Sequence, residues 1–512
     1  MRRCLLFLSL VLSMLIASPA LALDLDVSGS LQFEGIYNEK PTLDDNDPHQ
    51  SFREMRLRVL TEAQVTDKIK IITRFDALDK LLSSRDSAFD NDEDDDNIDF
   101  DRAYAEIITP VGLLSIGRMQ GVVWGTSWSD DETDTDRIKL VTPIPIGENK
   151  LYIGAVAEKV YESYDPNDPT AKDDDNNKYY LGATYQTKTF RTGLLSAFYH
   201  YNLFQDPGQA VLSKDVEQGT ADLLNAQALQ TEAINLGNLA TAALAGGQVA
   251  LATEYATQAS DKGDAALAAA STPAAVATNT LRNLPRGTTT KAKVYLLAPY
   301  FDGKFGPLGV TTELDYFLGE TEYDTNDTTR DVQGYSWFGE VRYDVGPVVV
   351  QAGYAITSGD ADYEDDKIKN MGYVAPGADW AKAFILTSDE HGMNTTLGDG
   401  LGNLVGDGIG SAYTACLDGY RMMYAGADFS PMDNLTLGAL IASSQADDTP
   451  SGIDDDHGIE YDLTLTWKIW DNIVYSGVAA YLQSGDYWAE RSGNADAKED
   501  TYALYHKLEI FF

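Results

Sequence analysis

Residues 459–469, with the sequence IEYDLTLTWKI, alternate strictly between apolar and polar side chains. The apolar set occupies every second position from Ile459 to Ile469, and the polar set fills the positions from Glu460 to Lys468. A period of two is that of a β-strand with one apolar face and one polar face. Because residues 25–37 and 335–345 repeat the pattern, the sequence predicts an all-β fold.

Similar runs extend along most of the chain, and the pattern predicts about 18 strands. We place them at 25–37, 52–65, 69–79, 98–108, 112–120, 137–142, 150–159, 178–187, 190–202, 291–303, 308–319, 332–345, 348–358, 420–430, 434–445, 457–470, 472–485 and 500–512.

The connections between these runs fall into two alternating classes. Short turns, such as TDK at 66–68 and GP at 346–347, alternate with long, polar and acidic loops. Transmembrane β-barrels sort their loops in this way, whereas a soluble β-sandwich has no reason to do so. We therefore predict a transmembrane antiparallel β-barrel of about 18 strands, with 16 as the alternative, and with both termini at the short-turn end. Alternation of lipid-facing and lumen-facing residues also accounts for the mean hydropathy of −0.26.

Residues 1–22 have the features of a secretory signal peptide. A basic start precedes an apolar run from Leu5 to Ile16, and the stretch ends in Ala20-Leu21-Ala22. The run is too short for a permanent transmembrane helix, and the small residues at its end match a cleavage site. We predict export with cleavage near Ala22, which leaves the barrel over residues 23–512.

The formal net charge of −42 argues against nucleic acid as a partner, because phosphate binding needs a basic surface. The acidic residues cluster in the segments 90–101, 130–136, 173–177 and 454–457, which fits solvated loops. Such carboxylates also suit Ca²⁺, although no segment has the spacing of an EF-hand. We therefore predict no cofactor beyond loosely bound Ca²⁺, with the candidate ligands Asp94, Asp95, Asp96, Asp173, Asp174 and Asp175.

Two long insertions interrupt the strand pattern. Residues 205–290 are rich in Ala and Leu on both sides of Gly246-Gly247, which predicts an α-helical hairpin within one long outer loop. This insertion is either a loop elaboration outside the membrane, or a plug or subunit contact. Residues 359–419 are too rich in Gly for a regular element, and they either fold into the lumen as a constriction or cover the mouth.

The parity of the strands predicts which side chains face the lumen. A basic wall would contain Arg56, Arg58, Lys70, Arg74, Arg102 and Arg118. An acidic wall would contain Glu313, Asp315, Glu340, Asp344, Glu460 and Asp462. Charged walls of this kind set ion preference in a pore. The alternative is that these groups pair with one another as structural ions, for example Arg342 with Glu340 or Asp344, and an error of one residue in register would reverse any strand.

The sequence gives little support for an enzyme. It has five histidines, no G-x-S-x-G, H-E-x-x-H or P-loop motif, and after signal cleavage a single cysteine, Cys416. Asp456-His457 is the one pair that imitates a catalytic pair, and it lacks further partners. We predict no catalytic activity and no haem attachment within this chain.

Residues 51–79 and 102–121 resemble Gram-negative outer-membrane porins, and 458–487 resembles the closing stretch of alginate-export-type barrels. The last strand, which ends at Phe512, is similar to the signal that the outer-membrane barrel assembly machinery reads. The resemblance implies an outer-membrane location, contact with lipid and lipopolysaccharide, and homotrimers in many relatives. It implies a water-filled channel for ions and small hydrophilic solutes. The alternatives are a substrate-specific channel for an anionic or oligosaccharide substrate and a scaffold barrel around an electron-transfer partner.

Overall fold

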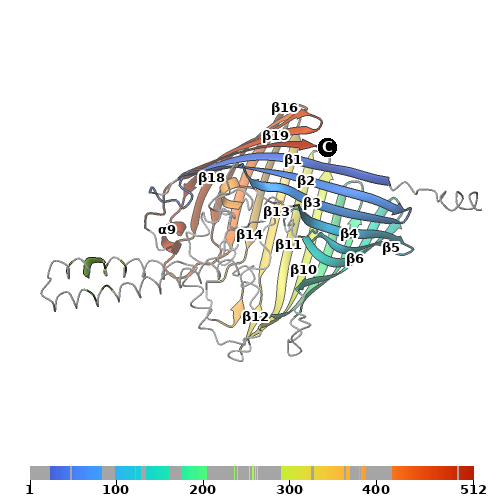
Figure 1. Cartoon of the computed structure of the whole chain (residues 1–512), viewed down its shortest axis with the longest axis horizontal. Helices are drawn as coiled ribbons and strands as arrows, with labels where there is room; N and C mark the ends of the chain where they lie inside the picture. The colour runs from blue at the N-terminus through green and yellow to red at the C-terminus, as the bar shows by residue number, and fades with distance from the viewer. Residues whose placement is uncertain are drawn as a thin grey trace, which may run out of the picture.

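The chain folds as a closed β-barrel in this computed structural model (Figure 1). The structure describes residues 24–46, 49–82, 98–121, 123–128, 134–161, 175–203, 290–323, 328–361, 365–369, 380, 382–387, 418–492 and 495–512, with a few positions between 236 and 262. Within this described part, 18 of the 20 strands form the barrel, so the predicted all-β, antiparallel barrel is confirmed and the alternative of 16 strands is wrong.

The barrel strands follow one another around the ring in chain order. They are β1 (Asp24–Asn38), β2 (Gln50–Thr66), β3 (Ile69–Leu81), β4 (Asp99–Thr109), β5 (Gly112–Gln120), β6 (Asp134–Ile146), β7 (Asn149–Tyr161), β8 (Asn176–Gln186), β9 (Phe190–Leu203), β10 (Thr290–Phe305), β11 (Leu308–Tyr323), β13 (Tyr335–Val345), β14 (Val348–Thr357), β16 (Tyr420–Met432), β17 (Leu435–Gln445), β18 (Asp456–Trp470), β19 (Ile473–Ser484) and β20 (Thr501–Phe511). Two short strands, β12 (Thr328–Val332) and β15 (Lys367–Ile368), pair in parallel beside the end of β11.

Each predicted strand corresponds to one strand of the ring, and the largest difference in length is at β6. The prediction ended this strand at residue 142, before Pro143 and Pro145, whereas β6 continues to Ile146. Its pairing with β5 ends at Val141, so the two prolines lie where one edge of β6 has no neighbour. A proline is tolerated on such an edge because no ladder hydrogen bond is lost.

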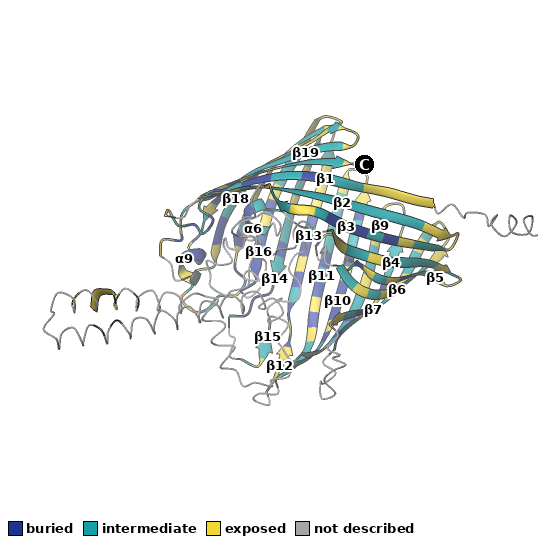
Figure 2. Ribbon diagram, in the orientation of Figure 1, coloured by how far each residue is buried: buried dark blue, intermediate teal, exposed yellow. Residues whose placement is uncertain are grey.

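Buried and exposed residues alternate along several strands of the barrel wall (Figure 2). On β18, Glu460 and Asp462 are 0% and 4% exposed, whereas Tyr461 and Leu463 are 43% and 63% exposed. The exposed set is apolar, as expected for a surface that lipid covers, and the buried set faces the interior. We call these the outer face and the inner face.

Part of the interior is a hydrophobic core. Inner-face residues of β13 to β20, such as Met422 and Leu482, are fully buried under side chains that come from the loops. These loop residues include Leu43 and Trp128, and two more belong to the short helix α9 (Tyr487–Ser492). The interior next to β13 to β20 is therefore filled by protein side chains where this cluster lies. The barrel is not an open cylinder there.

The predicted helical hairpin at 205–290 lies almost wholly outside the described residues. Those that are described there, including Leu236 and Ala256–Gln258, are helical. Among the described residues, no helix is both long enough and apolar enough to cross a membrane.

The seam of the barrel joins the first and last strands. β1 pairs with β20 from Ser30 opposite Phe511 to Asn38 opposite Ala503. Beyond this ladder, the Phe512 N–H donates to the Gly29 carbonyl at 3.0 Å, and the Gly29 N–H donates to the Phe512 carbonyl at 3.0 Å. The carboxyl terminus therefore lies beside β1 (Figure 1).

We expect deletion of Phe512 to reduce the yield of assembled barrel severalfold and to leave the conductance of each assembled pore unchanged. The deletion removes both hydrogen bonds to Gly29 and the aromatic side chain of the sequence-predicted assembly signal. Heat-modifiable gel mobility of membrane fractions measures the yield, and single-channel recording measures the conductance. The control is Phe305→Ala, which removes an exposed aromatic at the end of β10. Equal yields from the two variants would contradict the expectation.

Candidate functional site

Residues 123–128, which follow β5, lie against the inner face of β10, β11 and β13. The Trp124 indole N–H donates to the Ala298 carbonyl at 2.8 Å. The Thr126 backbone N–H and hydroxyl both donate to Glu313 Oε2, at 2.7 and 2.6 Å. The Trp128 indole N–H donates to Ser336 Oγ at 3.0 Å. These contacts hold the segment, which we call the first infolded segment, inside the barrel.

A second infolded segment, residues 382–387, contains the one-turn helix α6 (Phe384–Thr387). Glu460 accepts the backbone N–H groups of Ile385 and Leu386, at 2.6 and 2.9 Å. Asp462 accepts the N–H of Phe384 at 3.1 Å. Inner-face carboxylates of β18 thus bind three N–H groups that a helix start leaves without intrahelical partners.

The first infolded segment, Trp380 and the second infolded segment meet inside the barrel in one buried cluster, and we call this contact the constriction. The Trp128 and Trp380 rings lie 4.5 Å apart in an edge-to-face arrangement, and both rings contact Phe338 on β13. Lys382 Nζ forms an ion pair with Glu340 at 2.7 Å. The sequence left two alternatives for residues 359–419, which are folding into the lumen and covering the mouth. The described residues 382–387 lie inside the barrel, in agreement with the first.

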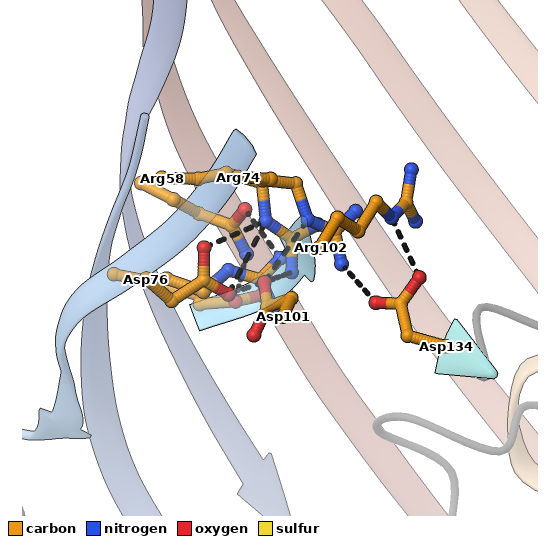
Figure 3. A network of polar contacts seen from close by, with 9 residues as sticks. Arg58, Arg74, Asp76, Asp101, Arg102 and Asp134 are labelled. Atoms are coloured by element: carbon orange, nitrogen blue, oxygen red, sulfur yellow. Dashed lines mark hydrogen bonds and ion pairs between the residues drawn. The ribbon is translucent and has the colours of Figure 1, made fainter. Parts of the chain in front are cut away.

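Arginines and aspartates alternate along the inner face of β2, β3, β4 and β6 (Figure 3). Arg58 binds Asp76 with its Nε and Nη2 at 2.8 and 2.7 Å. Arg74 contacts Asp101 at 3.0 Å and Asp134 at 2.9 Å. Arg102 contacts the other oxygen of Asp134 at 2.6 Å. We call these six residues the arginine–aspartate ladder, whose formal charges cancel.

A β-bulge explains why the sequence did not reveal Asp101. Arg74 lies opposite Arg102, but Asp76 lies opposite Asp99, so β4 has one residue more than β3 between these pairs. A bulge interrupts strict alternation, and it lets the neighbours Asp101 and Arg102 reach the same network.

The other predicted basic residues have different surroundings. Lys70 pairs with Glu62 at 2.9 Å, and Arg56 donates to Gln32 Oε1 at 3.3 Å. Arg118 lies on the outer face, on the same side of β5 as the exposed Ile116 and opposite the buried Ser115 and Met119. The prediction that Arg118 faces the lumen is therefore wrong, because the two faces of β5 were assigned one residue out of step.

The predicted acidic wall is on the inner face, but most of it does not face open water. Glu313, Asp315 and Glu460 are each at most 1% exposed. As described above, Glu313 and Glu460 hold the infolded segments, and Asp315 accepts a hydrogen bond from Ser336 at 3.3 Å. Asp344 pairs with Lys304 at 2.7 Å, and Glu340 lies 4.0 Å from Arg342. Asp344 and Glu340 are thus in ion pairs, as in the predicted alternative, whereas Glu313, Asp315 and Glu460 accept hydrogen bonds.

Two cavities lie beside the infolded segments. The larger, of about 780 Å³, is lined by charged groups of both signs, including Arg191, Asp302, Lys304 and Asp344. The smaller, of about 310 Å³, lies between Trp124 and the strands β6 to β11. Its lining includes Arg137 and Lys139, which the sequence analysis did not select although they share a face in an alternating run.

The remaining sequence candidates are structural or lie outside the described residues. Of the calcium candidates only Asp175 is described, and it pairs with Lys159. Among the described residues, no group of three His, Cys, Asp or Glu side chains is arranged to hold a metal ion. His457 is 3% exposed, hydrogen-bonds Ser444 Oγ through Nδ1 at 2.9 Å and packs on Tyr487. Asp456 accepts the Gly458 N–H instead of orienting the imidazole.

No known protein family matches the sequence, and no curated protein matches it. The chain is similar to the solved structure of Pseudomonas aeruginosa OccK8 (OprE), with 12% identity, a TM-score of 0.48, and coverage of 96% of this chain and 98% of that chain. For Pseudomonas aeruginosa OpdL the values are 9%, 0.49, 96% and 99%. For the outer membrane protein opdK of Pseudomonas aeruginosa they are 10%, 0.46, 95% and 98%.

Proposed function

We propose that this protein is an outer-membrane channel through which ions and small hydrophilic solutes diffuse passively. The observation that carries the proposal is a closed barrel of 18 strands with an apolar outer face and an ionic inner face. In lipid, backbone groups must all be paired, and a closed ring of strands meets that requirement. A ring of this size encloses far more space than its own side chains fill.

The constriction favours a second candidate, a channel that selects an anionic or oligosaccharide substrate. Trp128 and Trp380 meet inside the barrel, and the hydrophobic core fills the side formed by β13 to β20. The remaining path is bounded on another side by the arginine–aspartate ladder, so a solute passes close to fixed charges. Selection follows when a narrow path and fixed charges act together. We propose no catalytic step for any residue of the chain.

Planar-bilayer recording of the purified chain tests the proposal. We expect discrete, ohmic current steps in potassium chloride, because passive diffusion needs no energy source. Large steps without saturation by sugars or organic anions support the passive channel. Saturation by one class of solute supports the selective channel. Absence of current from correctly folded barrels would overturn both.

Arg56→Glu is expected to shift the reversal potential in a salt gradient towards cation preference. Among the described residues, Arg56 has no carboxylate at ion-pair distance. Its charge is therefore not cancelled by an ion pair, whereas that of Arg74 is. The substitution changes the fixed charge of the inner wall by two units, and fixed charges in a pore set ion preference. The control is Arg118→Glu, which makes the same change on the outer face. An equal shift in both variants would show that Arg56 does not line the path.

The partner and ion predictions remain proposals of the same kind. Contact with lipopolysaccharide, recognition by the assembly machinery, homotrimer formation and loose Ca²⁺ binding in the acidic loops each follow from the sequence arguments above. Chemical cross-linking of intact membranes tests the trimer, and calcium titration of the folded chain tests the ion.

A further inference from the structure

The cavity of about 310 Å³ differs in character from the rest of the interior. Its walls include Trp124, Val156, Leu195 and Leu296, so much of its lining is apolar. The larger cavity is instead lined by ion-paired side chains, and the arginine–aspartate ladder consists of ion pairs. A volume of this size is at the lower end of the range of ligand pockets, roughly 300–1,000 Å³, and suits one small molecule or ion.

Two glycines create the hollow. Gly154 on β7 lies directly opposite Gly182 on β8. A Cβ atom at Gly182 would come within 2.9 Å of the Trp124 ring, so the missing side chain lets the indole lie close to the wall. A Cβ atom at Gly154 would meet no atom closer than 4.0 Å, so the space above Gly154 is open.

Lys139 supplies the cavity with a positive charge. Its neighbour Arg137 is matched by Glu158, which also lies 3.7 Å from Lys178. Among the described residues, no carboxylate lies within ion-pair distance of Lys139 Nζ. An ammonium group in partly apolar surroundings is costly without a counterion. Glu106 on β4 and Lys139 on β6 both lie opposite Ser115 on β5, so the Glu106 carboxylate acts on the ammonium group from beyond ion-pair distance and is not a direct counterion.

We propose that this cavity binds a small monovalent anion of low charge density, held at Lys139. A strongly hydrated anion would lose its water against apolar walls that cannot replace it, whereas a large, weakly hydrated anion loses little. The lining also contains the aromatic side chains of Trp124 and Tyr152, and the edges of aromatic rings carry partial positive charge. Glu313 and Asp315, which are also in the lining, repel anions, and they repel a dianion more strongly than a monoanion.

The inference rests on the proposed function in one respect, since the anion enters through the lumen of the channel. It places anion recognition at Lys139 and away from the ladder, whose arginines already have carboxylate partners. Binding in the cavity does not itself require current, so the two proposals can fail separately.

Isothermal titration calorimetry of the folded chain in detergent tests the site, with potassium thiocyanate, chloride and sulfate as probes. We expect thiocyanate to bind at least tenfold more tightly than chloride, a free-energy difference of about 1.4 kcal/mol, and sulfate to give no binding heat. Lys139→Met should abolish thiocyanate binding, because it removes the charge and keeps the length of the side chain.

Gly154→Leu is a second, independent variant, because it fills the hollow and keeps Lys139. The matched control is Gly309→Leu, which adds the same side chain to the wall of the larger cavity, where a Cβ atom meets nothing closer than 3.6 Å. We expect Gly154→Leu to lose thiocyanate binding and Gly309→Leu to keep it. Heat-modifiable gel mobility verifies that each variant is folded.

Three results would overturn the inference: chloride bound as tightly as thiocyanate, undiminished binding in Lys139→Met, or equal loss in both glycine variants. If thiocyanate binds as expected but the protein passes no current in bilayers, the channel proposal fails and the anion site stands. If current is present but thiocyanate does not bind, the channel proposal stands and the anion site fails.

Discussion

Replacing Glu460 by alanine is expected to release the second infolded segment and to increase the single-channel conductance. The Glu460 carboxylate is fully buried and accepts two backbone N–H groups, from Ile385 and Leu386. Removing the carboxylate deletes both of these buried hydrogen bonds, and loss of the acceptor of a buried donor costs about 1–3 kcal/mol. Since few other polar groups hold this one-turn helix, such a loss is enough to favour departure of the segment from the wall.

Bilayer recording of Glu460→Ala measures the effect as a larger mean current with more noise. Glu460→Gln should be intermediate, because its amide oxygen still accepts one of the two hydrogen bonds. The matched control is Tyr461→Leu, one residue along the same strand but on the outer face, where 43% of Tyr461 is exposed. Unchanged conductance in Glu460→Ala would show that residues 382–387 do not limit the path.

Trp128→Ala is expected to have the second large effect. It should open the constriction by displacing the first infolded segment, whereas Glu460→Ala displaces the second. Trp128 is 1% exposed, stacks on Phe338 at 5.3 Å and contacts Trp380 at 4.5 Å. Truncation of a buried aromatic of this size costs about 3–5 kcal/mol. The barrel has its own hydrogen-bonded ring of strands, so we expect the loss to appear as movement of residues 123–128, with the barrel still closed.

Two measurements separate local from global change in Trp128→Ala. Conductance should rise, while the temperature at which the heat-modifiable gel band shifts should stay near that of the parent chain. Trp470→Ala is the control, because Trp470 is 66% exposed and makes no contact with the core cluster of the interior. Parallel loss of barrel stability and conductance would mean that Trp128 supports the wall as a whole.

The strands could be predicted because lipid and lumen impose opposite requirements on neighbouring residues. At Glu460, Tyr461 and Asp462 the alternation is strict, and the inner and outer faces are as expected. At β5 the inner face carries Ser115 and Gly117, so polarity does not distinguish the faces, and Arg118 was assigned to the wrong one. Parity is informative only where the two faces differ in polarity.

The ion partners could not be predicted, because they depend on register across strands. Asp134 binds Arg74 and Arg102 from a distance of 60 and 32 residues along the chain. The bulge at Asp101 removes even the parity argument there. One signal was present for the first infolded segment: Trp124 and Trp128 lie in a connection whose other residues are Gly, Val, Ser, Thr and acidic residues. Large aromatics in such a loop indicate burial elsewhere in the molecule.

The core inside the barrel has a consequence for the order of folding. Its members include Leu43 near the start of the chain, Trp128, Trp380, and Tyr487 near the end of the chain. These residues lie in connections that extend from the one after β1 to the one before β20, so no part of the barrel brings them all together. The core can therefore assemble only after the first and last strands have joined. Contacts of such sequence separation form late because loop closure must precede them. We therefore expect maturation in two stages, insertion of an open cylinder followed by inward collapse of its loops, with a transient species more conductive than the native protein.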